Sequence, residues 1–203
     1  MDIRKNLARF RSKVLLRGTR YEWAASTISM FAIAIMTALM LNLFVFQPYE
    51  VDGSSMEPTL QHDDRLIVYK LGRTWSKIVN DEYIPDRGDI VIFDKTGSND
   101  LQLVKRVVGL PGDTVSSVNG QILIQNQDSP EGFVFEEKFD LQLSVTEEFQ
   151  QTTVRSGQVF VVGDNRLPNA SLDSRSSLGS IDSDQIVGEL SMRIFPLSAF
   201  KFF

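Results

Sequence analysis

The chain has 203 residues, of which 42% are apolar and 23% charged, and this composition is typical of a globular protein rather than a disordered one. The net charge is −5, but residues 1–22 hold seven bases against two acids, which leaves 14 bases and 24 acids beyond them. Such an acidic body is a poor nucleic-acid binder, since neutralising phosphates needs clustered Lys and Arg. The chain contains no cysteine and one histidine, His62, which excludes disulfides, thiol nucleophiles and clustered Cys or His metal sites. We therefore expect neither a metal nor a cofactor.

An uncharged run of 24 residues extends from Trp23 to Phe46. As a helix with ~1.5 Å rise per residue it would be about 36 Å long, enough to cross a hydrocarbon core of roughly 30 Å. The alternative is a cleavable secretory signal, whose apolar region spans ~7–15 residues and ends in a small-x-small site. This run is longer and continues into Gln47-Pro48 without a small pair. We predict an uncleaved transmembrane anchor over residues 23–46.

Charge on the two sides of this run predicts its orientation. All seven bases of residues 1–22 precede the run, whereas the acids Glu50, Asp52 and Glu57 follow it. Because positive charge is retained on the cytoplasmic side, residues 1–22 are expected to form a basic cytoplasmic segment. The protein is then a single-pass membrane protein, with residues 47–203 on the extracytoplasmic side.

The body beyond the anchor is predicted to be mainly β. Short runs of β-branched and aromatic residues, bounded by Gly, Pro and Asp, predict strands. They lie at 65–69, 89–93, 101–108, 115–118, 121–125 and 158–162. Asn119-Gly120 is a two-residue hairpin signal, since both positions tolerate positive φ. We expect no long amphipathic helix, and we interpret about 119–155 as a β subdomain inserted into one β-sheet catalytic domain.

A candidate nucleophile lies in the turn that follows the apolar run, Gly53-Ser54-Ser55-Met56-Glu57-Pro58. Such a stiff loop can present a serine hydroxyl beside backbone N–H groups, as a nucleophile and its oxyanion site require. Turns of Gly, Ser and Pro are common, so this segment alone indicates only a loop.

A candidate base lies on the expected strand 101–108. Strand alternation places Lys105 on one face with Leu101, Leu103 and Val107. Desolvation on an apolar face lowers the pKa of a lysine, and a neutral amine can accept a serine proton. The alternative is a lysine at the sheet margin whose amine reaches water.

A third segment, residues 163–175, follows an apolar strand and is rich in short hydrogen-bonding side chains. Arg166 and Arg175 could pair there with Asp164 and Asp173. Charge-assisted hydrogen bonds would stiffen the loop and let it orient neighbouring catalytic groups. Without such neighbours it is a structured polar loop.

Together these segments resemble the type I signal peptidases, bacterial or plastid-like, a family of membrane-anchored serine proteases. The matching boxes are 53–60, Asp64-Arg65-Leu66, 105–113, and Gly163-Asp164-Asn165-Arg166 with Asp173-Ser174-Arg175. The resemblance implies that Ser55 is the nucleophile and Lys105 the general base. It places Gly53, Asp164, Ser171, Asp173 and Arg175 in supporting or oxyanion positions.

The same resemblance implies the substrates and partners. The substrates would be exported preproteins with small residues at positions −3 and −1. The partners would be the lipid bilayer and the secretion machinery at a plasma or thylakoid membrane, and no nucleic acid.

The sequence departs from the family pattern at two places. Gly53 stands where some members carry a serine whose hydroxyl helps to bind the oxyanion, so that site would rely on the Ser55 N–H and another backbone donor. The last box is two residues longer than usual, which affects the alignment of Ser171 more than that of Asp173 or Arg175.

Three alternatives remain at this point. His62, seven residues beyond Ser55, is a rival base, although the more common role of such a histidine is an exposed polar side chain. A self-cleaving repressor-type Ser/Lys protease shares the dyad but should carry a DNA-binding head. A noncatalytic membrane-tethered β domain would carry degenerate boxes, whereas Ser55 and Lys105 are both present.

Overall fold

The computed structural model describes residues 3–97, 101–136 and 146–203, with side chains from residue 21 onward. It divides into two units, Met1–Leu43 and Phe44–Phe203. The boundaries expected for the basic segment, the anchor and the insertion at about 119–155 stay predictions. Residues 1–2 of the basic segment and 137–145 of the insertion lie outside the described residues.

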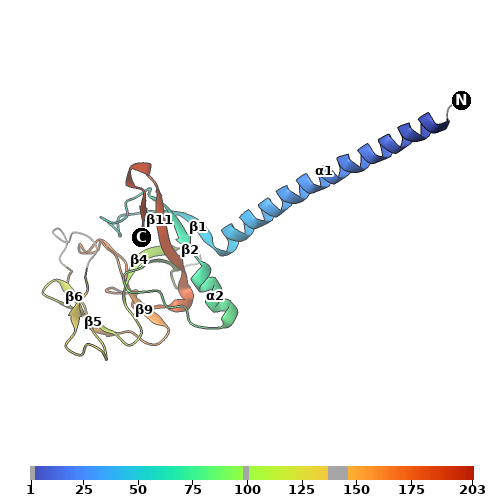
Figure 1. The fold of residues 1–203 in the computed structure, drawn as a ribbon. Coiled ribbons are helices and arrows are strands. Elements are labelled where there is room, and N and C mark those ends of the chain that lie inside the picture. The colour runs from blue at the N-terminus through green and yellow to red at the C-terminus, as the bar shows by residue number, and fades with distance from the viewer. Residues whose placement is uncertain (1–2, 98–100, 137–145) are drawn as a thin grey trace. The chain divides into compact units, whose positions relative to one another are not determined.

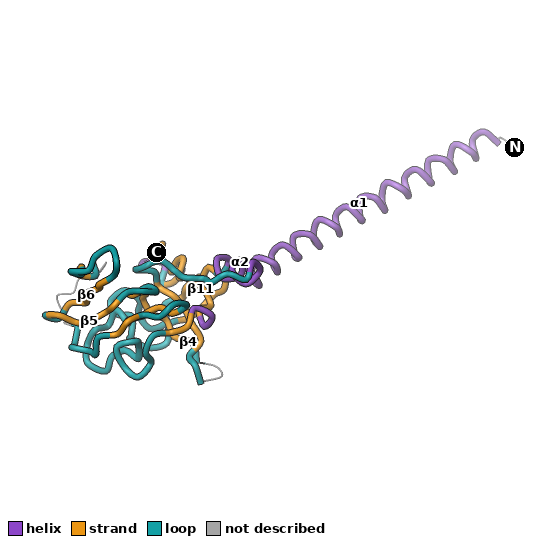
Figure 2. Tube along the Cα trace, turned by 90° about the horizontal axis from the view of Figure 1, so that it is seen from below, coloured by secondary structure: helices purple, strands orange, loops and turns teal. Residues whose placement is uncertain are grey.

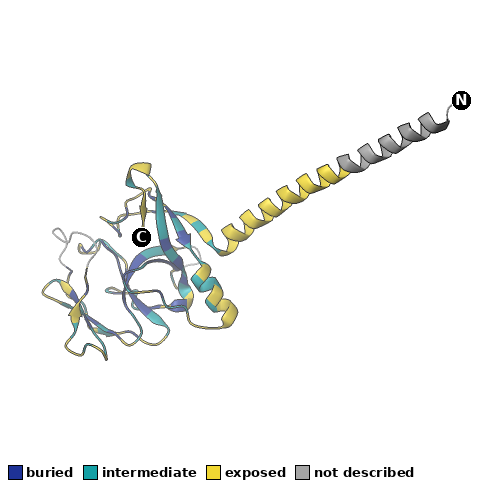
Figure 3. Ribbon diagram, viewed as in Figure 1, coloured by how far each residue is buried: buried dark blue, intermediate teal, exposed yellow. Residues whose placement is uncertain are grey.

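The first unit is helical. Helix α1 runs over Ile3–Phe44, and its part Tyr21–Phe44 has a mean hydropathy of 2.0 with no residue buried inside the protein. Figure 3 shows this part exposed on all sides. A helix with apolar side chains all around it is typical of a membrane span. The helix ends at Phe44, because Phe46 begins a strand that contains Pro48, and residues before proline disfavour helix.

The second unit is built on antiparallel sheets, as expected for a mainly β chain (Figure 1). Its larger sheet has the order β1-β2-β11-β3-β4-β9-β10, and β12 pairs with β11. The strands of this sheet are β1 (Phe46–Glu50), β2 (Arg65–Tyr69), β3 (Ile90–Asp94), β4 (Gln102–Gly109), β9 (Gln158–Val162), β10 (Ile181–Asp182), β11 (Ile186–Phe195) and β12 (Lys201–Phe202).

A smaller antiparallel sheet has the order β7-β6-β5-β8. Its strands are β5 (Thr114–Val118), β6 (Gln121–Gln125), β7 (Phe133–Val134) and β8 (Thr152–Thr153). Figure 2 shows β5 and β6 at the end of this unit that lies away from α2 (Leu71–Val79). The Asn119-Gly120 hairpin is confirmed, because both residues have positive φ, 53° and 79°, and Val118 pairs with Gln121.

Strands β3 and β4 form the centre of the larger sheet and separate two apolar clusters. Val91 pairs with Lys105, while Ile90 pairs with Arg106 on the opposite face. Val91 and Val107 pack in one cluster with buried residues of β9, and Ile90 packs in another with the loop after β1. Lys105 therefore projects from the middle of a sheet whose neighbouring positions are apolar.

Strands β1 and β11 and helix α2 are the longest of the elements of this unit that were not expected from the sequence. Strand β11 contains Gly188, Glu189 and Ser191, which break the β-branched pattern used to recognise the other strands. Strand β1 contains Pro48 and pairs only with β2 along the larger sheet, so its missing N–H is tolerated at an edge. Helix α2 is nine residues long and buries none of its residues.

Candidate active site

The loop that carries Ser55 is fixed by the two apolar residues that follow it. Met56 and Leu60 are fully buried in the cluster beside Ile90, and the Leu60 N–H donates to the Met56 carbonyl at 2.9 Å. The Glu57 N–H donates to the Ser54 carbonyl at 3.1 Å and closes the turn. Ser55 is thereby held between an exposed turn and the buried side chain of Met56.

The side chain of Lys105 reaches this loop from β4. Its Nζ donates to Ser55 Oγ at 2.7 Å and to the Val104 carbonyl at 2.7 Å. The lysine is 1% exposed, and this burial lowers its pKa from 10.5 to about 8. The carboxylates of Asp173 and Asp164 act to raise that pKa, and the Arg175 guanidinium acts to lower it.

The carboxylate that raises the pKa of Lys105 most belongs to Asp173, which is fully buried. It accepts hydrogen bonds from Arg175 Nε at 3.0 Å, from Arg175 Nη2 at 2.7 Å and from the Gly163 N–H at 2.9 Å. Burial acts to raise the pKa of Asp173, but the hydrogen bonds and charge of Arg175 outweigh it and hold the pKa below its usual value. Asp173 is therefore a stable buried anion.

A second buried carboxylate, Asp164, lies just after β9 and forms a bidentate pair with Arg106 of the neighbouring strand β4. Arg106 donates to it through Nε at 2.8 Å and Nη2 at 2.5 Å, and its Nη1 donates to the Gly88 carbonyl at 2.7 Å. The sequence analysis did not predict Arg106 as the partner of Asp164. It considered Arg166, which is close to Asp164 along the chain. Arg106 follows Lys105 directly, so the pair fixes the strand that carries the lysine.

Ser171 lies at a point of close approach between the two loops of the site. A Cβ on Gly163 would lie 2.2 Å from Ser171 Oγ and 2.5 Å from the Ser55 carbonyl oxygen. The buried Ser171 Oγ also lies beside Asp173, where its hydroxyl helps to lower the pKa of that carboxyl. Only glycine at position 163 leaves room for these groups, so Gly163 allows the segment after β9 to pack against the Ser55 loop.

Asn165 is a residue of this site whose role the sequence did not reveal. Its N–H donates to the Ser55 carbonyl at 3.1 Å, and its Nδ2 donates to the Ser54 carbonyl at 3.0 Å. These two bonds tie consecutive carbonyls of the serine loop to the segment after β9. The motif that contains Asn165 was recognised in the sequence. Its contact with residues 54 and 55 was not, because these segments are distant along the chain and no local pattern relates them.

His62 and Gly53 contact each other rather than Ser55. The Gly53 N–H donates to His62 Nδ1 at 3.2 Å, and the His62 side chain is 59% exposed beside Asp52 and Asp63. Within the described part of the chain, no contact joins His62 to Ser55, which argues against His62 as the base. Gly53 has a φ of 99°, a conformation that favours glycine.

Comparison with known proteins places this chain in a family. The family model described as signal peptidase, peptidase S26, matches residues 23–195. The chain is 35% identical to a signal peptidase I of Bacillus licheniformis over 190 residues, covering 91% of this chain and 94% of that protein. It is 38% identical to signal peptidase I T of Bacillus subtilis (strain 168) over 188 residues, covering 90% and 89%.

A solved structure is also similar, namely the crystal structure of a signal peptidase I from Enterococcus faecalis V583. It is 29% identical in sequence, with a TM-score of 0.41, and the match covers 53% of this chain and 97% of that one.

Asn165→Ala should slow preprotein cleavage by the full-length protein, because the Ser54 carbonyl loses the side-chain hydrogen bond that helps to position the loop, while the backbone bond to the Ser55 carbonyl remains. The expected loss is in kcat rather than KM, with thermal unfolding shifted only slightly. The control Leu167→Ala changes an exposed side chain two residues further along and should leave the rate unchanged. Wild-type kcat in the Asn165→Ala protein would contradict the positioning role.

Proposed function

This chain belongs to the signal peptidase family, peptidase S26, and from that premise we propose that Ser55 and Lys105 form its catalytic dyad. As a member of this family it is a serine peptidase that removes signal peptides from preproteins. The apolar helix α1 makes it a membrane-anchored protein. The observation that carries the proposed dyad is the 2.7 Å contact between Ser55 Oγ and the buried Lys105 Nζ.

In the proposed mechanism Lys105 acts first as a general base. A neutral amine retains N–H groups, one of which donates to the Val104 carbonyl. In this protonation state the 2.7 Å contact with Ser55 Oγ would reverse its direction, so that the hydroxyl donates to the lone pair of the amine. As Ser55 Oγ attacks the scissile carbonyl, its proton passes to the amine, and the resulting ammonium then protonates the departing amino group. The peptide bond breaks, and the signal peptide is left as an ester on Ser55.

The same amine would complete the second half of the reaction. Once the mature protein has departed with the first proton, Lys105 is neutral again and can take a proton from a water molecule. The hydroxide attacks the ester carbonyl, the bond to Ser55 Oγ breaks, and Oγ recovers a proton from Lys105. The products are the signal peptide carboxylate and the free enzyme.

The developing oxyanion needs donors close to Ser55. Among the described residues, the Ser55 N–H donates to no other group, so it is free to bind the oxyanion. The Gly53 N–H is already used by His62 Nδ1, and glycine supplies no hydroxyl there. We therefore assign one donor to Ser55 and a supporting conformational role to Gly53.

The buried charges around Lys105 have opposing effects in this proposal. Asp173 favours the ammonium that forms during the reaction, whereas Arg175 neutralises much of Asp173 and favours the neutral amine. Asp164 is held by Arg106 and keeps β4 in place. Ser171 supports the packing between the loops at Gly163.

The proposed substrates are exported preproteins cut after small residues at −3 and −1, as in the family that this sequence resembles. The apolar side chains beside the dyad support this proposal. Met56 is fully buried next to Ser55, and Val104 packs against the same cluster. The buried side of the dyad is thus apolar, which fits small, uncharged substrate residues at the cleavage site.

The proposed topology places the N-terminus in the cytoplasm and the catalytic unit on the extracytoplasmic side of a plasma or thylakoid membrane. The seven bases before the span and the acids after it support this orientation. A catalytic unit in that location would meet preproteins as they leave the secretion machinery.

Ser55→Ala and Lys105→Met should each reduce preprotein processing by on the order of 10⁴-fold or more, since they remove the nucleophile or the base. Methionine keeps the apolar volume of a buried lysine stem, so the fold should persist, as circular dichroism can verify. The matched control Ser54→Ala alters the neighbouring exposed hydroxyl and should retain activity. Processing at the wild-type rate by either dyad variant rules out the proposed mechanism.

The rate of processing should rise with pH through a midpoint set by Lys105, whose pKa burial lowers to about 8, because only the neutral amine can accept the serine proton. Asp173→Asn removes a charge that raises this pKa, so the midpoint should move to lower pH. Arg175→Gln removes a charge that lowers it, so the midpoint should move to higher pH. Full pH profiles of kcat test these signs, and shifts in the same direction for both variants would contradict the assignment of the base.

A further inference from the structure

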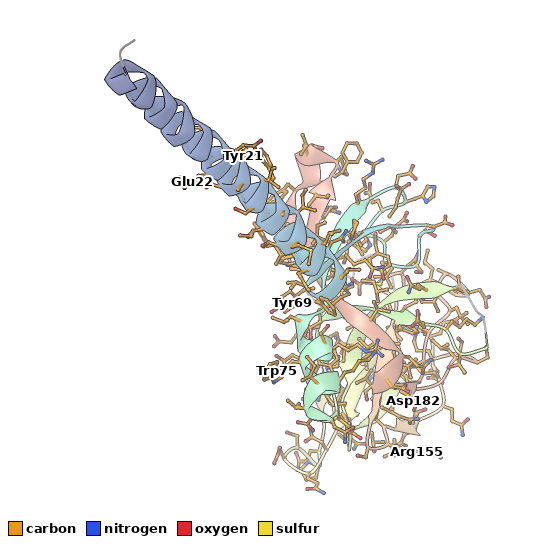
Figure 4. The ribbon with its side chains drawn as sticks, turned by 90° about the vertical axis from the view of Figure 1, so that its right-hand side faces the viewer. Tyr21, Glu22, Tyr69, Trp75, Arg155 and Asp182 are labelled. Carbon is orange, nitrogen blue, oxygen red and sulfur yellow. The ribbon has the colours of Figure 1, made fainter. Side chains whose placement is uncertain are left out.

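Helix α2 presents an apolar face to its surroundings rather than to the protein. Its apolar residues recur at helical spacing on one side, and all are exposed: Leu71 by 40%, Trp75 by 62%, Ile78 by 70% and Val79 by 50%. Figure 4 labels Trp75 on the outer side of α2, and Figure 3 shows much of the helix exposed.

The inner side of the same helix is small and polar. A Cβ on Gly72 would lie 2.7 Å from the Tyr83 ring, so this position packs against the segment before β3. Arg73 donates to the Asp184 carbonyl, and Thr74 Oγ1 donates to the Phe44 carbonyl at 3.2 Å. A surface helix in water normally turns its apolar side to the core and its polar side outward. The orientation of α2 is the reverse of this rule.

The position of α2 within the catalytic unit indicates what covers this face. Phe44 is the last residue of the candidate membrane span, and its carbonyl accepts the hydrogen bond from Thr74. One residue further, the Val45 carbonyl accepts the Lys70 N–H at 2.7 Å, at the start of the helix. Two hydrogen bonds therefore tie α2 to the point where the chain leaves the bilayer, whatever direction the anchor takes.

We propose that α2 is an interfacial helix whose outer face, Leu71, Trp75, Ile78 and Val79, inserts into the lipid headgroup region beside the anchor. Tryptophan is enriched at that depth, since its ring is apolar and its N–H remains hydrated. The exposed Lys77 borders this face, and a lysine stem can extend along apolar surface while its ammonium stays at the headgroups.

This second contact has a consequence beyond anchoring. One transmembrane helix joined to a domain leaves the domain free to tilt and rotate about the junction. An inserted helix at the same junction fixes the orientation of the domain to the bilayer plane. The serine loop belongs to the same unit as α2, so its height above the membrane would be set by this contact.

Fluorescence of Trp75 in the full-length protein tests the proposal without relying on catalysis. The chain has two tryptophans, so Trp23→Phe leaves Trp75 as the single reporter. The protein is reconstituted in vesicles of phosphatidylcholine and phosphatidylglycerol, some with lipids brominated near the glycerol end of the acyl chain. We expect strong quenching by these lipids, weaker quenching by lipids brominated near the methyl end, and protection from aqueous acrylamide.

A matched control places the reporter on an exposed strand of the smaller sheet. In a protein with Trp23→Phe, Trp75→Phe and Val118→Trp, the residue at 118 should be quenched by acrylamide and not by brominated lipid. Equal acrylamide quenching at 75 and 118 would overturn the proposal. So would protection of Trp75 that depends on protein density or on added preprotein, since either result assigns the face to a second copy or to the substrate.

A functional arm uses the double variant Trp75→Gln with Ile78→Gln, which keeps helix-forming residues but removes the apolar face. Preprotein cleavage in vesicles should fall several-fold, while cleavage in detergent stays at the wild-type rate. An equal loss in both media would overturn the orienting role. This outcome is distinguishable from failure of the proposed dyad, because the Ser55 and Lys105 variants should be inactive in vesicles and in detergent alike.

Discussion

The structure depends on one buried amine. Lys105 lies in the centre of the larger sheet with almost no exposure, and its Nζ contacts Ser55 Oγ and a backbone carbonyl. A permanently charged lysine in this position would carry a large desolvation cost, which the contacts of a neutral amine avoid. The low pKa and the contact with a hydroxyl therefore have one cause, namely the apolar strands that surround β4. In this account the fold itself makes a base without histidine.

The rest of the site limits how that amine can move and titrate. Arg106 fixes β4 by its pair with Asp164, and Arg175 holds the Asp173 carboxylate that acts on the amine. Buried ion pairs add little net stability, but breaking one leaves an uncompensated charge, so such pairs fix geometry more than they add stability. Gly163 permits the close approach that lets this framework contact the serine loop.

Much of this could be predicted from sequence, and the exceptions have physical reasons. The strands over 65–69, 121–125 and 158–162 were predicted with their observed bounds, because β-branched runs and turn residues are local signals. Strand β11 was missed, since its stability comes from pairing with β2, β3 and β12 rather than from its own residues. The Arg106 pair and the Asn165 ties join segments distant in sequence, which no local pattern encodes. The outward apolar face of α2 was missed because composition does not reveal which side of a helix packs.

The most direct test is a titration of the Lys105 amine itself. Selective ¹⁵N labelling of lysine in the full-length Ser55→Ala protein, with Lys105→Met to assign the signal, lets NMR follow the Nζ chemical shift against pH. The account predicts a midpoint near pH 8, since burial lowers the pKa to about that value. A midpoint at the ordinary lysine value of 10.5 would show that the amine is charged at neutral pH and contradict its role as the base.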